Sequence, residues 1–278
     1  MLLCEQGIGD QVMFASCLPD LLSRVGAESG FVECDPRLVP LFARSFPQIA
    51  AIARPADPAV LPPVAPCDTA EYLGTLPKYL RRRIDEFPQA AGYLRPNPEL
   101  VAKWRASLAR FGGALKVGIS WHGGKDAETR RRRSIPLDLW APLFQVPGVQ
   151  FVNVQYGWAA AEAIGVQDRF GIRLDNGSDC NALRDLDDFA AKMAALDLVI
   201  SVDNSTAHLA AAIGRPVWTL LPFAADWRWM LDRETTPWYP TMRLLRCRSA
   251  DNWTELVQRT ARLLTSATFS RDLRSRVA

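Results

Sequence analysis

Short apolar runs alternate along the chain with longer stretches in which apolar residues recur at every third or fourth position. Short apolar runs bounded by Gly, Pro or Asp are typical of buried strands, and the longer spacing is typical of amphipathic helices. In the first half this pattern predicts strands at residues 2–4, 31–34 and 49–53 and helices at 11–25 and 36–46. Pro19 predicts a kink in the first helix, and the β-α-β-α-β order predicts a parallel sheet.

The second half repeats the same alternation. We expect its last helix to pack back toward the first half, and we expect the helix at 206–213 to end at Gly214, because glycine adopts the left-handed conformation that closes many helices. The predicted strands are 116–121, 149–155, 198–202, 217–221 and 243–245, and the predicted helices are 137–145, 186–196, 206–213 and 253–264.

The stretch between the two halves is less regular. The sequence predicts an irregular connection at residues 54–70, with a short strand around Val60, and a helix at residues 99–111. Residues 71–95 stay unassigned. The predicted fold class is α/β, with two Rossmann-like, doubly wound domains that face a cleft. We expect these domains at 1–105 and 106–265, with a hinge near 97–114 and a flexible tail at 266–278.

Composition narrows the classes of function. The 278 residues are 49% hydrophobic and carry a net charge of only +3, which indicates a sizeable core and gives no general case for a nucleic-acid partner. The six cysteines form no C-x-x-C pair, so neither a metal site nor another cofactor is predicted. No signal peptide and no apolar run of roughly 18–20 residues is present, so we expect no membrane span and a cytoplasmic location, with peripheral membrane association left open.

Two arginine runs, Arg81–Arg83 and Arg130–Arg133, stand out from this near-neutral background. Either run is compatible with a solvated face. The second run is also compatible with anion contacts beside a phosphorylated ligand, because arginine binds phosphate through paired, charge-assisted hydrogen bonds.

The first candidate site is Gly7-Ile8-Gly9-Asp10, a glycine-rich turn from the first strand into the first helix. Such a turn lets a ligand approach the backbone closely. The motif is incomplete as a dinucleotide fingerprint, which argues against a nicotinamide dehydrogenase. Asp10 is compatible with two roles: a helix cap, or a general base at the carboxyl edge of the sheet, where α/β proteins bind ligands.

The second candidate site follows the third strand of the second half. Asp203 ends that strand, Asn204, Ser205 and Thr206 begin the next helix, and His208 lies within its first turns. Free N–H groups at a helix start, the helix dipole and the two hydroxyls predict an anion site. His208 is either a core histidine or a ligand that reaches a β-phosphate through a charge-assisted hydrogen bond.

Aromatic side chains are concentrated at Asp226–Trp229 and at Trp238–Tyr239. One interpretation is that this region packs on its own domain. The alternative is a stacking surface for a nucleotide base or an acceptor sugar, with Arg228 reaching a phosphate.

Taken as a set, these motifs resemble glycosyltransferase family 9, which includes the heptosyltransferases. The similarity covers about residues 3–265 and is greatest to the family-9-like domains of bacterial tetratricopeptide-repeat proteins. One departure is Ser16-Cys17-Leu18-Pro19, where heptosyltransferases favour Thr-x-Pro. The motifs are E-Q-G-x-G-D at Glu5–Asp10, W-x-G at Trp121–Gly123, R-S-I-P-L at Arg133–Leu137, S-V-D-x-x-x-A-H-L at Ser201–Leu209 and D-W-R-W at Asp226–Trp229.

The resemblance implies a fold of the GT-B type and a metal-independent glycosyltransferase that moves a sugar from a nucleoside diphosphate donor to an acceptor. It implies that Asp10 is the catalytic base, that the stretch from Asp203 to His208 holds the diphosphate, and that the loop at Trp121–Gly123 lines the cleft. The acceptor stays open among a glycan, a lipid and a protein. The alternative function is a nucleotide-sugar or glycan binding module without turnover. The predicted substrate-binding residues are Gly9, Gln11, Trp121, His122, Gly123, Asp203, Asn204, Ser205, Thr206, His208 and Arg228.

Overall fold

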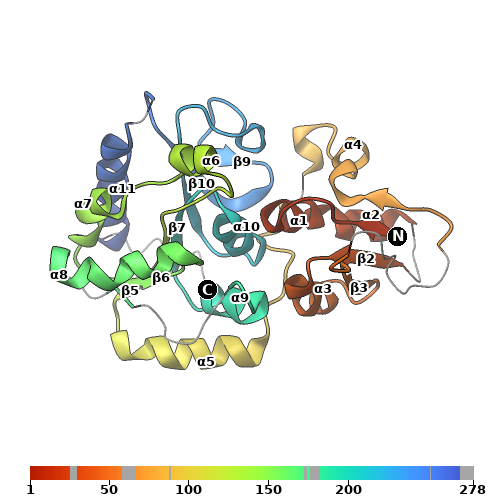
Figure 1. Ribbon diagram of the computed structural model, residues 1–278, viewed down its shortest axis with the longest axis horizontal. Coiled ribbons are helices and arrows are strands. Elements are labelled where there is room, and N and C mark those ends of the chain that lie inside the picture. Colours follow the sequence, from red (N-terminus) through yellow and green to blue (C-terminus); the bar gives the residue numbers. More distant parts are fainter. Residues whose placement is uncertain are drawn as a thin grey trace.

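The computed structural model contains two separate parallel sheets that lie side by side along the long axis of the molecule (Figure 1). It describes residues 1–25, 30–57, 67–87, 89–171, 174–175, 182–250 and 252–269. We call the elements from β1 to α4 the N-terminal unit and those from α5 to α11 the C-terminal unit. The predicted strand around Val60 lies outside the described residues.

The N-terminal unit is a four-stranded sheet in the order β3-β2-β1-β4, with every strand pair parallel. Its core is formed by apolar side chains of the strands and of the first three helices. The strands are β1 (Leu2–Leu3), β2 (Phe31–Cys34), β3 (Ala50–Ala53) and β4 (Glu71–Tyr72), and the helices are α1 (Ile8–Phe14), α2 (Leu18–Val25), α3 (Val39–Ser45) and α4 (Pro77–Leu80).

The C-terminal unit is a six-stranded sheet in the order β6-β5-β7-β8-β10-β9, parallel except for the short edge strand β9. The strands are β5 (Leu115–Ser120), β6 (Val149–Asn153), β7 (Leu198–Val202), β8 (Val217–Leu221), β9 (Thr235–Thr236) and β10 (Tyr239–Arg246). The helices are α5 (Pro98–Leu108), α6 (Ala127–Arg133), α7 (Ala141–Phe144), α8 (Val166–Phe170), α9 (Leu186–Ala194), α10 (Ser205–Ala212) and α11 (Trp253–Phe269).

The two faces of the C-terminal sheet belong to different cores. Leu198, Ile200 and Val202 of β7 pack in a core with α7 and α11, whereas Val199 packs in a core that continues into the N-terminal unit. This division follows from the alternation of side chains along a strand. Both faces are covered, which is why the central strands β7 and β8 are almost wholly apolar. The prediction of an α/β fold with two parallel, doubly wound sheets is confirmed.

Several local predictions differ from the structure. The helix predicted at 11–25 is interrupted by a 3₁₀ turn at Ala15–Cys17, so that Pro19 lies in the first turn of α2, where its missing N–H costs nothing. Helices α6 and α8 and strand β4 were not predicted, because their sequences are short and carry little apolar periodicity. The helix predicted at 206–213 is α10, and Gly214 follows it in the left-handed conformation (φ +81°).

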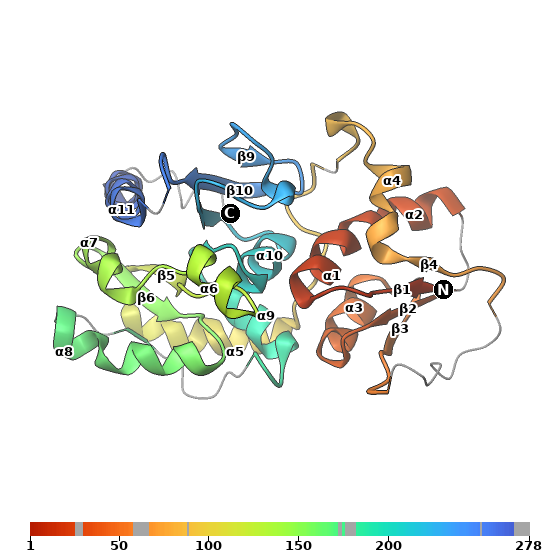
Figure 2. The ribbon, with the colours of Figure 1, turned by 45° about the horizontal axis from the view of Figure 1, so that its top comes forward.

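The last helix is the clearest correction. Helix α11 contacts α7 and β10 of its own unit, and Figure 2 shows it on the side of the C-terminal unit away from the N-terminal unit. The prediction that it packs back toward the first half is therefore wrong. The helix also continues to Phe269, so the start of the tail predicted at residue 266 falls inside it.

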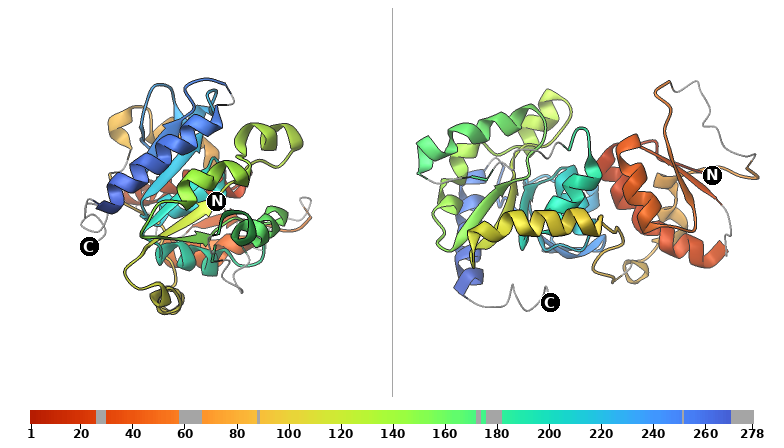
Figure 3. Two further views of the ribbon diagram at one scale, coloured as in Figure 1. Left: turned by 90° about the vertical axis from the view of Figure 1, so that its left-hand side faces the viewer. Right: turned by 90° about the horizontal axis from the view of Figure 1, so that it is seen from below.

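The chain crosses between the two units just before α5. The backbone N–H groups of Tyr93 and Leu94 both donate to the Ala212 carbonyl at the end of α10. Helix α5 then packs along α9 (Figure 3, right). The predicted division at residue 105 stays a prediction, and we propose that all of α5 moves with the C-terminal unit.

Replacing Gly92 with Ala is expected to destabilise the protein by about 1–3 kcal/mol, the cost of overpacking a tight contact. A Cβ at Gly92 would lie 2.6 Å from the backbone nitrogen of Gly214 and 2.8 Å from the carbonyl carbon of Ile213. Because backbone atoms meet there, the connecting segment would have to move away from the end of α10. Urea unfolding measures the effect, with Gly113→Ala as the matched control, since nothing lies within 4 Å of a Cβ there. Equal stability of the two variants would contradict the prediction.

Candidate functional site

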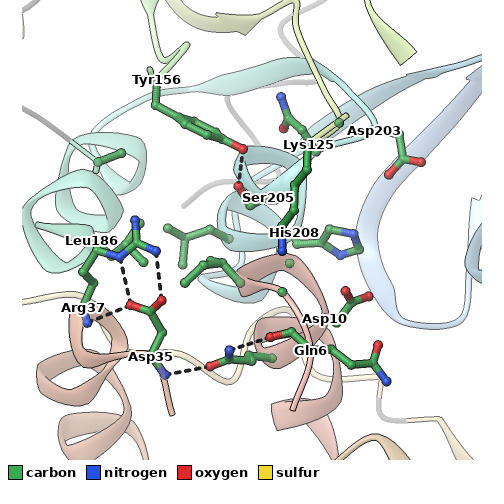
Figure 4. A pocket seen from close by; sticks show the side chains of 18 of the residues that line it. Gln6, Asp10, Asp35, Arg37, Lys125, Tyr156, Leu186, Asp203, Ser205 and His208 are labelled. Carbon is green, nitrogen blue, oxygen red and sulfur yellow. Dashed lines mark hydrogen bonds and ion pairs between the residues drawn. The ribbon is translucent and has the colours of Figure 1, made fainter. Parts of the chain in front are cut away.

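A cleft of about 670 Å³ lies between the two units, a volume in the range of small-molecule sites. The N-terminal unit contributes the first turn of α1 and the residues after β2 and β3, and the C-terminal unit contributes the residues after β5, β6, β7 and β8 (Figure 4). Of the predicted site residues, those on the cleft are Gly9, Asp10, Gln11, Asp203, Asn204, Ser205, His208 and Arg228.

Asp10 lies in the first turn of α1, and its carboxylate faces the C-terminal unit. Gly7 is the N-cap residue of α1, so the helix-cap role for Asp10 is wrong. Its Oδ1 instead accepts a hydrogen bond from Nη2 of Arg228 at 2.5 Å. This ion pair joins the two candidate motifs across the cleft, although they are more than two hundred residues apart.

The ion pair continues into a chain of alternating charges. Arg228 also contacts Asp226 at 2.9 Å, and Asp226 accepts a hydrogen bond from Arg133 at 2.9 Å. Arg133 in turn lies 3.3 Å from Oδ2 of Asp203. The chain Asp10–Arg228–Asp226–Arg133–Asp203 therefore runs along one wall of the cleft with three carboxylates and two guanidinium groups.

Asp203 is the most buried member of this chain, with a side chain that is 2% exposed. Burial raises the pKa of its carboxyl group, while the neighbouring Arg133 acts in the opposite direction. Arg133 is the last residue of α6, and the sequence analysis named it in an arginine run and in the R-S-I-P-L motif but not as a site residue. The structure separates it from its neighbours in that run and directs it into the cleft.

The start of α10 is less open to an anion than predicted. Asn204 caps the helix, and its Oδ1 accepts hydrogen bonds from the backbone N–H groups of Thr206 and Ala207 at 3.0 and 3.3 Å. These are the N–H groups that a phosphate would have used. Its amide nitrogen donates to the His122 carbonyl at 2.8 Å. Asn204 therefore has a structural role that ties two loops together.

His208 is a buried, neutral histidine at the edge of the cleft. It is 3% exposed, its Nδ1 lies 2.8 Å from the hydroxyl of Tyr239, and its ring stacks on Trp229. Burial lowers the pKa of His208 to about 3, and the nearby Arg228 and Arg133 act in the same direction. His208 is therefore a neutral ring at neutral pH, and its contact with a β-phosphate stays a prediction.

Acidification is expected to destabilise the protein through His208. Its pKa in the folded state lies below the ordinary value of 6.5, so below pH 6.5 the unfolded chain binds a proton that the folded chain does not. Stability should fall by about 2 kcal/mol between pH 6.5 and pH 5 from this group alone. Urea unfolding of the wild type and of His208→Asn at both pH values measures the difference, and an equal loss in both proteins would contradict the prediction.

Four predicted residues do not line the cleft. Trp121 is fully buried in the core beneath the sheet, and its indole N–H donates to Glu162. His122 contacts the same carboxylate at 3.0 Å and lines a different cavity. A Cβ at Gly123 would lie 2.6 Å from the Asp203 carbonyl oxygen, so that glycine permits a close contact between two loops. Thr206 is also fully buried.

Gln11 borders the cleft, but both ends of its side-chain amide form hydrogen bonds that stabilise the fold. Its amide nitrogen donates to the Gln6 carbonyl, and its Oε1 accepts from the backbone N–H of Asp35. These bonds fix the end of β2 against α1. Asp35 in turn holds Arg37 through two hydrogen bonds at 2.8 and 2.9 Å (Figure 4).

The sequence analysis missed Lys125 and Tyr156. Lys125 follows Gly124 in the loop after β5 and extends across the cleft, so that its Nζ would lie 3.4 Å from a Cβ at Gly7 (Figure 4). No carboxylate in the described part of the chain forms an ion pair with it. The Tyr156 hydroxyl accepts a hydrogen bond from Ser205 at 2.7 Å. The signal for both was their position in a loop that follows a parallel strand, where α/β proteins place ligand contacts.

Most aromatic side chains of the region 226–239 pack inside the protein, whereas Arg228 lies in the cleft. Trp229 and Tyr239 are buried around His208, and Trp238 packs edge-to-face on Phe14 and Phe87 of the N-terminal unit. These rings form the contact between the units. Arg228 lies in the cleft, as expected, but it contacts carboxylates there.

Two further observations concern cofactors and membranes. Among the residues that the structure describes, no group of three or more His, Cys, Asp or Glu side chains is placed to hold a metal ion. None of the described helices has both the length and the apolar character that a membrane crossing requires.

Comparison with known proteins identifies similarities for part and for all of the chain. Residues 182–230 match the family model described as glycosyltransferase family 9 (heptosyltransferase). The matched segment includes Asp203, His208 and Arg228. The chain is also similar to Protein FlbA of Caulobacter vibrioides, with 35% identity over 275 residues, which are 95% of this chain and 46% of FlbA. The chain thus spans about half the length of that relative.

Two solved structures share the fold. E. coli ADP-heptose lps heptosyltransferase II has a TM-score of 0.65 at 14% identity, and the match covers 97% of this chain and 99% of that one. E. coli heptosyltransferase WaaC with ADP-2-deoxy-2-fluoro heptose has a TM-score of 0.57 at 11% identity, with 97% and 99% covered. These matches confirm the GT-B type fold.

Proposed function

We propose that this chain is a glycosyltransferase that moves a sugar from a nucleoside diphosphate donor to a hydroxyl group of an acceptor. The observation that carries the proposal is the meeting of Asp10 from one unit with Arg228, Arg133 and Lys125 from the other in a single cleft. A carboxylate that accepts a proton and cations that stabilise a leaving diphosphate are the two requirements of this reaction.

In the proposed reaction, the acceptor oxygen forms a bond to the anomeric carbon while the bond from that carbon to the diphosphate oxygen breaks. The proton of the acceptor hydroxyl passes to Asp10. The charge left on the diphosphate is stabilised by Arg133, Arg228 and Lys125. The arginines present paired donors to phosphate oxygens, and Lys125 adds a point charge.

The ion pair between Asp10 and Arg228 bears on the order in which the donor and the acceptor bind. While Arg228 contacts Oδ1 of Asp10 at 2.5 Å, that oxygen is occupied by the ion pair and does not contact an acceptor hydroxyl. A donor diphosphate competes for Arg228 and thereby releases Asp10. We therefore propose that the donor binds before the acceptor.

The donor is proposed to be a nucleoside diphosphate sugar, since the WaaC structure of the same fold holds an ADP-sugar. Tyr156, Leu186 and Phe189 supply an aromatic and apolar surface at the C-terminal side of the cleft, which suits a nucleotide base. The acceptor stays open among a glycan, a lipid and a protein. The cytoplasmic location and the association with tetratricopeptide repeats also stay predictions.

Isothermal calorimetry with ADP, UDP, GDP and CDP, followed by donor hydrolysis with the sugar nucleotide of the tightest binder, tests the proposal. We expect one nucleoside diphosphate to bind with a 1:1 stoichiometry and its sugar nucleotide to be cleaved slowly without acceptor. A protein that binds none of them in a folded state would overturn the donor assignment.

A binding module without turnover is the second candidate, and one observation favours it. That observation is the ion pair of Asp10 with Arg228, which would then be a permanent part of the contact between the units. In that case nucleotide binding would be retained, and neither hydrolysis nor transfer would be detected with any donor that binds.

A further inference from the structure

A second cavity, of about 800 Å³, lies on the C-terminal unit outside the cleft. It is bounded by α6, by the loop after β8 and by the start of α11, and it shares no lining residue with the cleft. Neither the proposed transfer reaction nor the nucleotide assignment uses any of its side chains.

The wall of this cavity is strongly basic. Arg130, Arg131 and Arg132 of α6 all line it, and no Asp or Glu does. In the described part of the chain none of the three forms an ion pair, whereas Arg133, the next residue, contacts both Asp203 and Asp226. Three neighbouring guanidinium groups without a counter-charge repel one another. An anionic ligand would relieve this repulsion, so its binding there would be electrostatically favourable.

Another part of the lining is apolar and aromatic. Phe223, in the loop after β8, is 59% exposed, and the cavity is also lined by Trp253 at the start of α11 and by Pro136 and Pro222. Exposed aromatic side chains beside a cavity are typical of ligand contacts, since a ring offers a flat apolar face. Guanidinium groups and an aromatic face together select a ligand that has both charge and a ring.

We propose that this cavity binds a small oligoanion, one that carries several phosphate or carboxylate groups and a ring or apolar face. The charged groups contact Arg130, Arg131 and Arg132, and the ring lies against Phe223. Arginine suits both kinds of anion, because its planar fork donates paired hydrogen bonds to carboxylate and phosphate alike. The site is independent of the proposed glycosyl transfer.

The test is calorimetry on the full chain with two probes, tripolyphosphate, which has charge only, and mellitate, a benzene ring with six carboxylates. The variant Arg130→Gln/Arg131→Gln/Arg132→Gln is expected to raise the Kd of both probes by roughly 30-fold, because three partly screened charge contacts are lost. The variant Phe223→Ser is expected to weaken mellitate and leave tripolyphosphate unchanged. Thermal melts establish that each variant is folded.

One control separates this site from general charge. The variant Arg82→Gln/Lys103→Gln/Arg105→Gln removes the same charge from exposed positions elsewhere. It should bind the probes within about twofold of the wild type, since charges beyond a Debye length are screened. Equal weakening by the control triple variant, or full binding in the α6 triple variant, would overturn the proposal. Failure of nucleotides to bind would not affect it.

Discussion

Replacing Asp10 with Asn is expected to lower the rate of sugar transfer by roughly 10²–10⁴-fold, the usual share of general base catalysis. The amide cannot accept the proton of the acceptor hydroxyl, and it has nearly the same shape. Gly7 caps α1, so the substitution removes no cap. The lost ion pair with Arg228 is partly exposed and should cost at most about 1 kcal/mol of stability. The measurement is a single-turnover transfer rate beside a thermal melt and a donor titration.

Asp138→Asn is the matched control for this prediction, because the Asp138 side chain is exposed, pairs with Arg169, and does not line the cleft. It should transfer sugar at the wild-type rate. If the folded Asp10→Asn variant also keeps the wild-type rate, Asp10 has no part in the chemistry. The cleft would then be left as a nucleotide site, which is the binding-module alternative.

Replacing Arg133 with Met is expected to destabilise the protein by about 3 kcal/mol at neutral pH, because it leaves the buried carboxylate of Asp203 without its cation. Burial already raises the pKa of Asp203, and removing Arg133 raises it further. A carboxyl group whose pKa is raised by folding destabilises the protein increasingly as pH rises above its unfolded value. The deficit of the variant should therefore be larger at pH 8 than at pH 5 in urea unfolding.

A double variant separates charge from packing in this prediction. Asp203→Asn removes the buried charge, so adding it to Arg133→Met should restore most of the lost stability. If the double variant is no more stable than Arg133→Met, the loss came from the packing of α6 and not from the buried carboxylate. Donor binding should stay weak in both variants, since neither has the Arg133 guanidinium.

The α/β fold could be predicted because a strand that is buried on both faces consists mainly of apolar residues, which the sequence shows directly. Leu198–Val202 is apolar on both faces because both faces are covered, and Gly214 marks the end of α10 through its left-handed backbone. Short elements such as α6 and β4 could not be predicted, since a few residues carry too little periodicity. The position of α11 also escaped prediction, because an amphipathic helix shows which face is buried but not against which partner it packs.

For the site, the sequence by itself determined which segments reach the cleft: the turn before Asp10 and the residues after β7 follow parallel strands, and the carboxyl ends of such strands form one edge. Only the tertiary structure decided what each side chain does there. Asn204 became a cap, His208 a buried neutral ring, and Trp121 a core residue. The physical reason is that burial, charge pairing and hydrogen bonding depend on neighbours that are distant in the chain, as in the contact of Asp10 with Arg228.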